Sequence, residues 1–260
     1  MRSQRRLVNP NMSIGGYSIE YQSVLDKAIS LGFTIPNQVE RDRQQSKINA
    51  LVDNNLWDKL EFFMEFKGEP NAIDFRTLCW KRLVLTDKIP TENNFTWDNE
   101  GGTNDQGSAI DLNWNIEIAN QAAPGNLSIG VFAKDGIKAY AYGGREDVSS
   151  KQILLWAEPY LDRYRLRFLE RNDVYIPLNG TEKTYIASAL NGKVSNYNGG
   201  VKMHEKSVTT FETTSQNLYC FALNNSGTIA RGAIEHLGNI FGSVGLTDSE
   251  AQIMDQILKM

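Results

Sequence analysis

The spacing of apolar residues predicts a first helix that begins just after Ser18, a residue type that often caps helix N-termini. Gly32 stands where that helix would end. Between them the apolar positions recur three and four residues apart, as one face of a helix requires: Tyr21, Val24, Leu25, Ala28 and Ile29.

A second helix is predicted to open near Pro36. Its first half, ERDRQQSK, is strongly polar, and its apolar stripe comes late, at Ile48, Leu51, Val52 and Leu56, continued by Trp57 and Leu60. The pattern predicts a helix that buries its C-terminal half and leaves its N-terminal half in water or against a polar partner. So small a two-helix unit has too few apolar positions to stand alone, so we expect it to pack on the rest of the chain beyond residue 60.

Beyond residue 60 the pattern changes to short aromatic and β-branched runs separated by Gly, Asn, Asp and Thr. The stretch LSIGVFAKDGIKAYAY (127–142) predicts a hairpin around a type I′ turn at Asp135-Gly136, with Val131 facing Tyr140. Both sides of this hairpin are apolar, whereas a sheet with one face in water alternates. We therefore expect a second sheet to cover one face, and the helices or a neighbouring subunit to cover the other.

The stretch RYRLRFLER (163–171) alternates strictly and predicts a half-buried strand with a basic outer row. Further strands are predicted at TYIASAL (184–190), at KVSNY after the Asn191-Gly192 turn, at SVTTFET (207–213) and at LYCFAL (218–223). The last is apolar throughout, which predicts a central strand. Several short strands with tight turns and no intervening helices predict an antiparallel sandwich.

The chain finishes on a predicted third helix, in FGSVGLTDSEAQIMDQILKM. Thr247 with Glu250 three residues on makes a capping box, and Leu246 and Ala251 occupy staple positions. Its apolar face comprises Ile253, Met254, Ile257 and Leu258. We expect this helix to cover the sandwich.

These patterns divide the chain into three parts: a flexible basic N-terminal arm (1–16), a helical docking segment (17–60) and a β-sandwich with a C-terminal helix (61–260). The 260 residues carry a net charge of −4, which gives the whole molecule no electrostatic attraction to nucleic acid. No apolar run reaches the length of a membrane span. Cys79 and Cys220 lie among apolar residues and are expected to be buried free thiols.

The sequence predicts neither an enzyme nor a cofactor. Its two histidines, His204 and His236, are too few for a histidine-based metal site without carboxylates. Glycosidases need two carboxylates across the sugar bond, and the E-x-D-x-x-E pattern of sandwich glycosidases is missing. The nearest acids, read here as surface and turn carboxylates, are Glu146, Asp147, Glu170 and Asp173. A calcium site would need oxygens from Asp98, Asn99, Asp105 and Asp111, whose spacing fits no loop motif.

Two features could support binding. Arginines on the arm and on the alternating strand could grip carboxylates or phosphates of a partner, the alternative being a solvated tail and a solvated strand face: Arg2, Arg5, Arg6, Arg163, Arg165 and Arg167. Aromatic side chains near loops could bind a glycan, the alternative being core packing: Tyr142, Trp156, Tyr160 and Tyr197.

The order of three segments resembles virion proteins of Bacteroidetes-infecting phages, crAss-like phages included. These are SIEYQSVLDKAISLGFTIPN, KINALVDNNLWDKLEFFMEF and IFGSVGLTDSEAQIMDQIL. WDKL (57–60) and LTDSE (246–250) stand at the places where that family has its own motifs. The match covers about 17–66 and 217–260 and is looser between; CWKRLVLTDK and NEGGTNDQGSAIDLNW depart from the family's pattern.

The resemblance implies a concanavalin A/LamG-like jelly roll and a structural or adhesive role as head fibre, capsid decoration or tail appendage. A location in the virion, after synthesis in the bacterial cytoplasm, follows from that role. The doubly apolar hairpin and the half-exposed second helix predict in addition a homo-oligomer, with a trimer favoured. The arm and helices would meet other virion proteins, and the jelly roll would be displayed. A carbohydrate-binding module or adhesin is the alternative function, and a polysaccharide-degrading enzyme a third. Neither a nucleic acid nor a membrane is expected as partner.

Overall fold

The structure is a computed structural model. It describes residues 16–69, 71–89, 95–104, 108–134, 140–146, 152–158, 163–168, 174–177, 184–211, 214–232 and 236–260. The predicted arm therefore lies outside the described residues, apart from Gly16. No helix among the described residues is long and apolar enough to cross a membrane.

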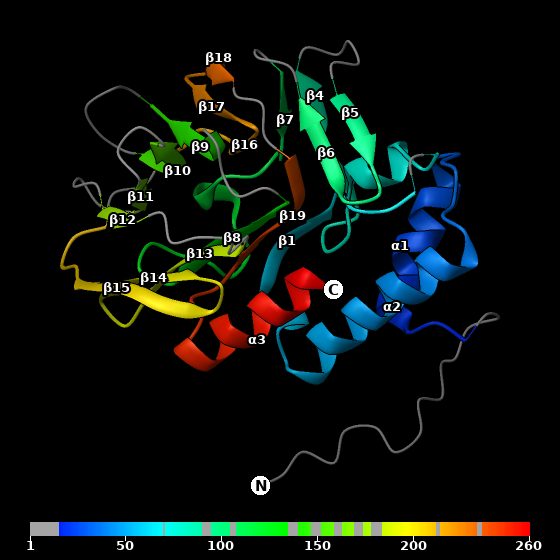
Figure 1. Cartoon of the computed structure of the whole chain (residues 1–260), viewed down its shortest axis with the longest axis horizontal. Helices are drawn as coiled ribbons and strands as arrows, with labels where there is room; N and C mark the ends of the chain where they lie inside the picture. Colours follow the sequence, from blue (N-terminus) through cyan, green and yellow to red (C-terminus); the bar gives the residue numbers. More distant parts are fainter. Residues whose placement is uncertain are drawn as a thin grey trace, which may run out of the picture.

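Two sheets face each other and make a β-sandwich, as predicted (Figure 1). The eight-stranded sheet runs β15 (Val201–Ser207), β14 (Lys193–Asn198), β13 (Thr184–Leu190), β8 (Leu127–Ala133), β19 (His236–Ser243), β6 (Gly101–Asn104), β5 (Phe95–Asp98), with β1 (Leu60–Glu65) also on β19. The nine-stranded sheet runs β12 (Val174–Pro177), β11 (Arg163–Phe168), β10 (Gln152–Glu158), β9 (Tyr140–Arg145), β16 (Tyr219–Cys220), β7 (Ala109–Asp111), β4 (Asp87–Ile89). In it, β17 (Ala222–Asn225) pairs with β9 and with β18 (Thr228–Gly232).

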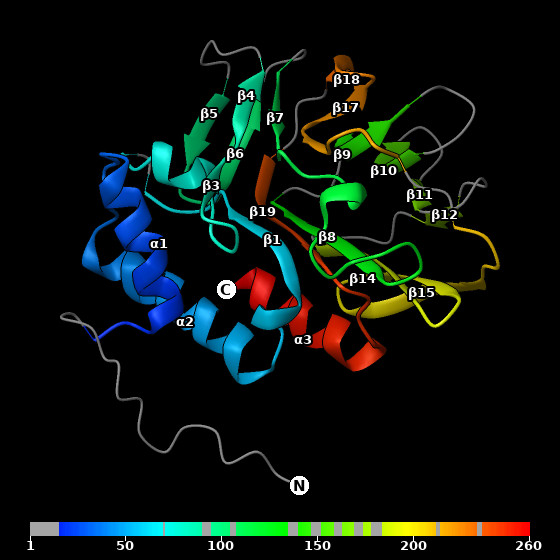
Figure 2. The ribbon, with the colours of Figure 1, turned by 180° about the vertical axis from the view of Figure 1, so that it is seen from behind.

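Three α-helices lie against the outer face of the eight-stranded sheet (Figures 1 and 2). They are α1 (Ile19–Ser30), α2 (Gln38–Asp53) and α3 (Asp248–Lys259). Short 3-10 helices η1 (Trp57–Lys59), η2 (Asp74–Thr77) and η3 (Ile116–Ile118) and the small pair β2 (Leu78–Cys79) and β3 (Val84–Leu85) complete the chain. The mainly β class with two leading helices and a closing helix is confirmed.

The caps of α1 and α3 were read from local sequence, and the cap of α2 was not. The side chain of Ser18 accepts a hydrogen bond from the backbone of Tyr21, and that of Asn37 caps α2, one residue after the expected Pro36. At α3 the capping box between Thr247 and Glu250 is present. These signals are local, because each cap needs only a side chain and the first turn of the helix that it caps.

The predicted hairpin at 127–142 is wrong. β8 and β9 belong to different sheets, and Val131 lies opposite Tyr185 and Ile240 rather than Tyr140. The expected turn at Asp135-Gly136 lies outside the described residues. The inference that both faces are covered is nevertheless confirmed for β8, which is buried at every position. A strand apolar on both sides fits the middle of a layered structure, where long-range partners decide the pairing.

Apolar side chains pack in two layers. One lies inside the sandwich and includes Ile129, Val131, Tyr142, Leu155 and Ile240. The other lies between the eight-stranded sheet and the helices and includes Val24, Leu51, Phe132, Ile186, Phe241 and Leu258. The helices therefore cover the second face of β8. This is one of the two predicted alternatives, the other being a neighbouring subunit. Gly130 leaves room for this packing, since a Cβ there would lie 2.4 Å from a ring carbon of Phe241.

Of the other strand predictions, several are confirmed and one is wrong. The strands at 184–190 and 193–197 form as predicted, and LYCFAL lies centrally but is broken at Phe221, whose φ is +65°. The predicted strand at 207–213 is wrong: the chain leaves β15 at Ser207 and is irregular over 208–211, while 212–213 lie outside the described residues. The strand that does form, β15, is polar and occupies a sheet edge, where no alternation is needed.

Candidate functional site

The helical segment and the closing helix meet at a seam made by two segments far apart in sequence. The ammonium group of Lys59 lies 2.5 Å from a carboxylate oxygen of Glu250. The backbone N–H of Val244 donates to the carbonyl oxygen of Lys59 at 3.0 Å. Partial burial raises the pKa of Glu250, but Lys59 and Thr247 outweigh it, and the net pKa is lowered. The carboxylate is therefore ionised and available to both the cap and the ion pair.

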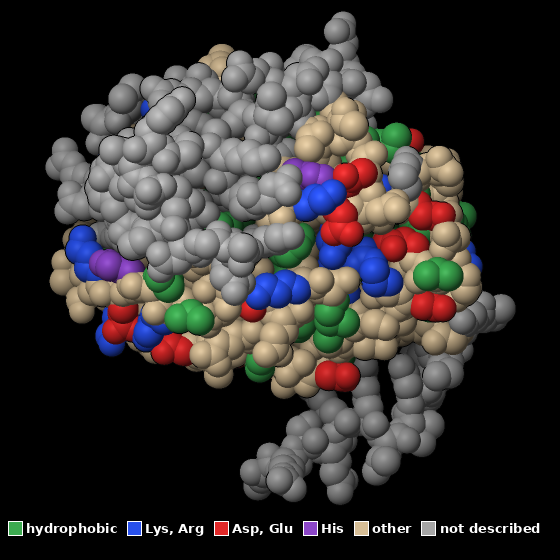
Figure 3. Space-filling view, in the orientation of Figure 1, with side chains coloured by type: hydrophobic (Ala, Val, Ile, Leu, Met, Phe, Trp, Pro, Cys, Tyr) green, Lys and Arg blue, Asp and Glu red, His purple; other side chains and the backbone are tan. Residues whose placement is uncertain are grey.

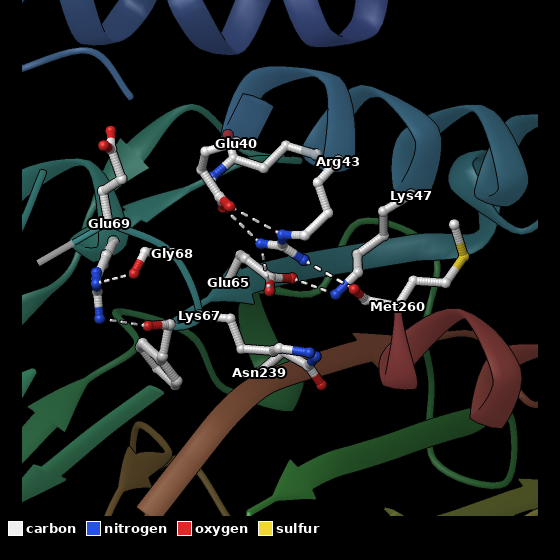
Figure 4. Close-up of polar contacts among 12 residues, drawn as sticks. Glu40, Arg43, Lys47, Glu65, Lys67, Gly68, Glu69, Asn239 and Met260 are labelled. Carbon is white, nitrogen blue, oxygen red and sulfur yellow. Dashed lines mark hydrogen bonds and ion pairs between the residues drawn. The ribbon is translucent and has the colours of Figure 1, made fainter. Parts of the chain in front are cut away.

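A second polar site lies beneath α2, where Glu40, Arg43, Lys47 and Glu65 form a charge cluster (Figure 4). Lys47 Nζ lies 2.7 Å from Glu65 Oε2, and both side chains are fully buried. Arg43 lies 3.2 Å from the other oxygen of Glu65 and 2.6 Å from Glu40, and it donates to the carbonyl oxygen of Met260 at 3.2 Å. The cluster thus joins α2, β1 and the end of α3.

The electrostatics of the charge cluster suit a structural role. Burial lowers the pKa of Lys47 to about 8, although Glu65 opposes that shift. A buried ion pair seldom adds net stability, but it penalises any packing in which either partner is left alone. The charge cluster therefore fixes how α2 sits on β1. The polar half of α2 has its predicted polar partner within the same chain.

Arg76 is a third buried charge, and it has carbonyl oxygens as its partners. Its guanidinium donates to Phe66 at 2.9 Å, to Asp98 at 2.7 Å and to Gly101 at 3.2 Å, and also to Gly68. It lies 5.5 Å from the ring centroid of Trp97. Burial lowers its pKa to about 10. Arg76 thus ties η2 to the loops at the ends of β1 and β5.

A surface pocket of about 330 Å³ lies at the corner where β14 and β15 meet the start of α3. Tyr197 lines it, and its hydroxyl donates to Asp248 Oδ1 at 2.7 Å. Lys202 bridges Asp248 and Glu205 at 2.8 Å from each, and Lys193 lies 2.7 Å from Glu205. Figure 3 shows acidic and basic side chains intermixed at this corner. We name Lys193, Tyr197, Lys202, Glu205 and Asp248 the corner site.

The predicted binding residues are scattered. Arg2, Arg5, Arg6 and Tyr160 lie outside the described residues, and Arg163, Arg165 and Trp156 are described only as backbone of β11 and β10. Arg167 is half-buried. Tyr142 is 1% exposed within the sandwich, which is the core-packing alternative. Of the four aromatic candidates, Tyr197 is the one that lines a pocket among the described residues.

Glu146 and Asp98, two of the candidate acids and metal ligands, contact other residues of the fold. Glu146 accepts from the backbone and hydroxyl of Ser215 at 2.9 and 3.0 Å. Asp98 lies 3.0 Å from His236 and 3.3 Å from Lys134. Across the described ranges no three His, Cys, Asp or Glu side chains are grouped to hold a metal ion. Four of the candidates lie outside these ranges: Asp105, Asp147, Glu170 and Asp173.

Both cysteines, Cys79 and Cys220, are buried free thiols, as predicted. The sequence reasoning missed the charge cluster, Arg76 and most of the corner site. One signal was available: Gln44 and Lys47 continue the helical spacing of Ile48 and Leu51, and all four are buried. The members of the corner site come from separate elements, so no spacing in the sequence reveals them.

No protein-family model and no curated protein matches the chain. Several solved structures are similar in fold. Trypanosoma rangeli sialidase with 2,3-difluoro-KDN gives a TM-score of 0.53 at 11% identity, over 85% of this chain and 40% of the sialidase. The same sialidase with sialic acid gives 0.51 at 12% identity, over 84% and 39%. The CBM40 of Ruminococcus gnavus IT-sialidase bound to α2,3-sialyllactose gives 0.47 at 15% identity, over 59% and 95%.

This chain therefore spans less than half the length of the sialidase that it matches. At these identities the likeness is one of fold. It defines the class of the protein by its fold, a β-sandwich.

Proposed function

We propose that this chain is a structural protein of a bacteriophage particle, of the kind carried by Bacteroidetes-infecting phages. In this proposal the lectin-like sandwich is displayed on the capsid or tail, as head fibre, capsid decoration or tail appendage. The helices α1 and α2, with the preceding arm, are the part that meets other virion proteins.

The observation that supports this proposal best is the seam. The segments that resemble phage virion proteins include two motifs, WDKL and LTDSE, that the sequence separates widely. In the fold Lys59 of the first pairs with Glu250 of the second at 2.5 Å. Two motifs that must recur together in a family are expected to meet in space, whereas two chance matches are not.

The direct test is the composition of the particle. Particles of a phage that encodes this chain are purified on a density gradient and digested for mass spectrometry. We expect peptides of this chain to co-migrate with the major capsid protein and antibodies against the chain to label intact particles. A chain found in the soluble lysate and missing from gradient-purified particles would overturn the proposal.

Self-assembly is part of the same proposal, with a trimer as the favoured state. The second apolar face of β8 no longer supports it, because the chain's own helices cover that face. What supports it is exposed apolar surface on the helical segment, with Ile29 60% and Val39 79% exposed. Sedimentation equilibrium at micromolar concentration should give the mass of a trimer. A soluble monomer under those conditions would refute self-assembly.

The proposed role is non-enzymatic. Glu146, the one of the four candidate acids within the described residues, is held by Ser215. Incubating the chain with 4-nitrophenyl glycosides should release no 4-nitrophenol. Release that disappears in a Glu146→Gln variant would contradict this part of the proposal.

Carbohydrate binding by the displayed sandwich is a second candidate function. The lectin-like fold and the pocket beside Tyr197 favour it. A glycan array probed with the full chain separates the two roles, since the absence of any signal would leave the structural role alone.

A further inference from the structure

We propose that the corner site binds a neutral saccharide, through the carboxylates of Glu205 and Asp248 and the ammonium group of Lys193, which line the pocket, and through the ammonium group of Lys202, which bridges the two carboxylates. This rests on carbohydrate binding as the second candidate function and names its site and ligand class. The pocket at the corner site has a volume of about 330 Å³, at the lower end of the range for small-ligand pockets. This volume suits a terminal sugar better than an extended sugar chain.

The fold brings the corner site together from distant elements. Lys193 and Tyr197 lie on β14, Lys202 and Glu205 on β15, and Asp248 in the first turn of α3. Alternation along β14 places Tyr197 on the face toward the helices, opposite Ile186, which packs in the helical layer. Figures 1 and 2 both show β15 and the start of α3 at one corner of the molecule. The pocket therefore exists only when α3 is docked.

The charges of the corner site are fixed at physiological pH. Lys193 and Lys202 lower the pKa of Glu205 to about 2. Lys202 and the hydroxyl of Tyr197 likewise lower the pKa of Asp248. Burial and Asp248 raise the pKa of Tyr197 to about 12, so its hydroxyl remains protonated. Two carboxylates and two ammonium groups then give the corner site a net charge of zero.

The hydrogen-bonding capacity left over indicates the ligand. An ammonium group has three donors. Lys193 spends one on Glu205, and Lys202 spends one each on Glu205 and Asp248, so both keep donors facing solvent. The carboxylate oxygens and the Tyr197 oxygen retain lone pairs, and carboxylates accept strongly from hydroxyl groups. A ligand must therefore donate and accept at closely spaced positions, as the hydroxyls of a sugar do.

The zero net charge selects neutral ligands over charged ones. An acidic saccharide would place its carboxylate beside Glu205 and Asp248, and a cationic ligand would face the two lysines. Either would gain attraction from one pair of charges and lose a similar amount to repulsion by the other pair. A neutral polyol can bind while all the ion pairs stay in place, which is why we assign this class.

The test is a titration of the isotope-labelled full chain by NMR. Glucose, galactose, mannose, N-acetylglucosamine and lactose are the neutral probes, with glucuronic acid and sialyllactose as acidic probes, each added to about 10 mM, above the millimolar Kd of a weak binder. At least one neutral probe should give saturable shifts confined to β14, β15 and the first turn of α3, and the acidic probes should give none there.

Glu205→Gln and Lys193→Met should each weaken that binding at least tenfold without changing Tm. The matched control is Lys206→Met, the next residue on β15, whose partner across the sheet, Val194, faces the sandwich interior. It should leave binding unchanged. No shifts with any neutral probe, stronger shifts with an acidic one, or binding that survives Glu205→Gln would each overturn the assignment.

The two proposals fail separately. Loss of sugar binding leaves the presence of the chain in phage particles untouched. A chain that binds sugar but is missing from purified particles refutes the virion role alone.

Discussion

Removing the carboxylate of Glu65 should reveal how much the charge cluster depends on pairing. In a Glu65→Leu variant Lys47, fully buried, loses its ion-pair partner, while Arg43 keeps Glu40 and Met260. Breaking a buried pair from one side costs about 3–5 kcal/mol, because a charge is left uncompensated. That is a large part of the roughly 5–15 kcal/mol that stabilises a typical domain.

The protonation equilibrium of Lys47 sets an independent upper limit on that loss of stability. The buried side chain can avoid carrying an uncompensated charge by losing its proton. Holding a lysine neutral at pH 7 against an unfolded pKa of about 10.4 costs about 4.6 kcal/mol, at about 1.4 kcal/mol for each pH unit. The two routes give similar magnitudes, so we expect the variant to fold with Lys47 neutral and a free energy of unfolding lowered by about 4 kcal/mol at pH 7.

The sign of the pH dependence is set by proton binding. In the variant the unfolded chain binds one more proton than the folded chain, so its free energy of unfolding rises with pH. In the natural chain the folded state begins to release the Lys47 proton as the pH approaches its folded pKa of about 8, which adds a smaller slope of the same sign. The deficit of the variant should therefore shrink by about 1 kcal/mol between pH 7 and pH 8.

Urea unfolding followed by tryptophan fluorescence measures both quantities. Lys47→Met with Glu65→Leu removes both charges and should recover most of the loss. Lys59→Met is the matched control: its pair with Glu250 has side chains 32% and 22% exposed, so its loss should stay below about 1 kcal/mol. A Glu65→Leu deficit below about 1 kcal/mol, or one equal at pH 7 and pH 8, would refute the reasoning.

Three further substitutions test other parts of the fold by the same urea assay. Arg76→Met leaves buried carbonyl oxygens without a donor and should cost at least about 3 kcal/mol; a loss under about 1 kcal/mol would contradict its role. Thr247→Ala removes the capping box and should cost about 1 kcal/mol, against no change for Ser249→Ala. Asn196 is 1% exposed, and within the described ranges neither polar atom of its side chain is hydrogen-bonded, so Asn196→Val should raise stability by about 1 kcal/mol; a loss would show that the amide has a partner.

Local features are the ones that the sequence predicts well. The cap at Thr247 and the ends of the helices depend on residues within one turn of each other, and so they could be read directly. The two-sided burial of β8 was also predictable, because its composition leaves neither face suited to water. The strands that pair with β8 could not be predicted from the sequence. A turn signal at Asp135-Gly136 carries no information about β13 and β19, which lie some 50 to 110 residues further along the chain.

The charge cluster and the corner site also depend on contacts between elements far apart in the sequence. Lys47 and Glu65 come from different elements, and neither residue alone announces an ion pair. The position of Lys47 one helical turn before Leu51 was a signal for burial that the predicted polar half of α2 did not use, and a buried lysine requires a partner. Tyr197 was selected as an aromatic residue near a turn, but Glu205 and Asp248 became its neighbours only through the docking of α3.

This dependence makes α3 the element on which both proposals turn. Its apolar residues Met254, Ile257 and Leu258 cover the outer face of the eight-stranded sheet. Its C-terminal end is held by Arg43 and by Asn239, which donates to the carbonyl oxygen of Leu258 at 2.9 Å. Its first turn supplies Asp248 to the corner site and Glu250 to the seam. The contact with the helical segment and the proposed sugar pocket are therefore built by one helix, so undocking α3 must remove both together.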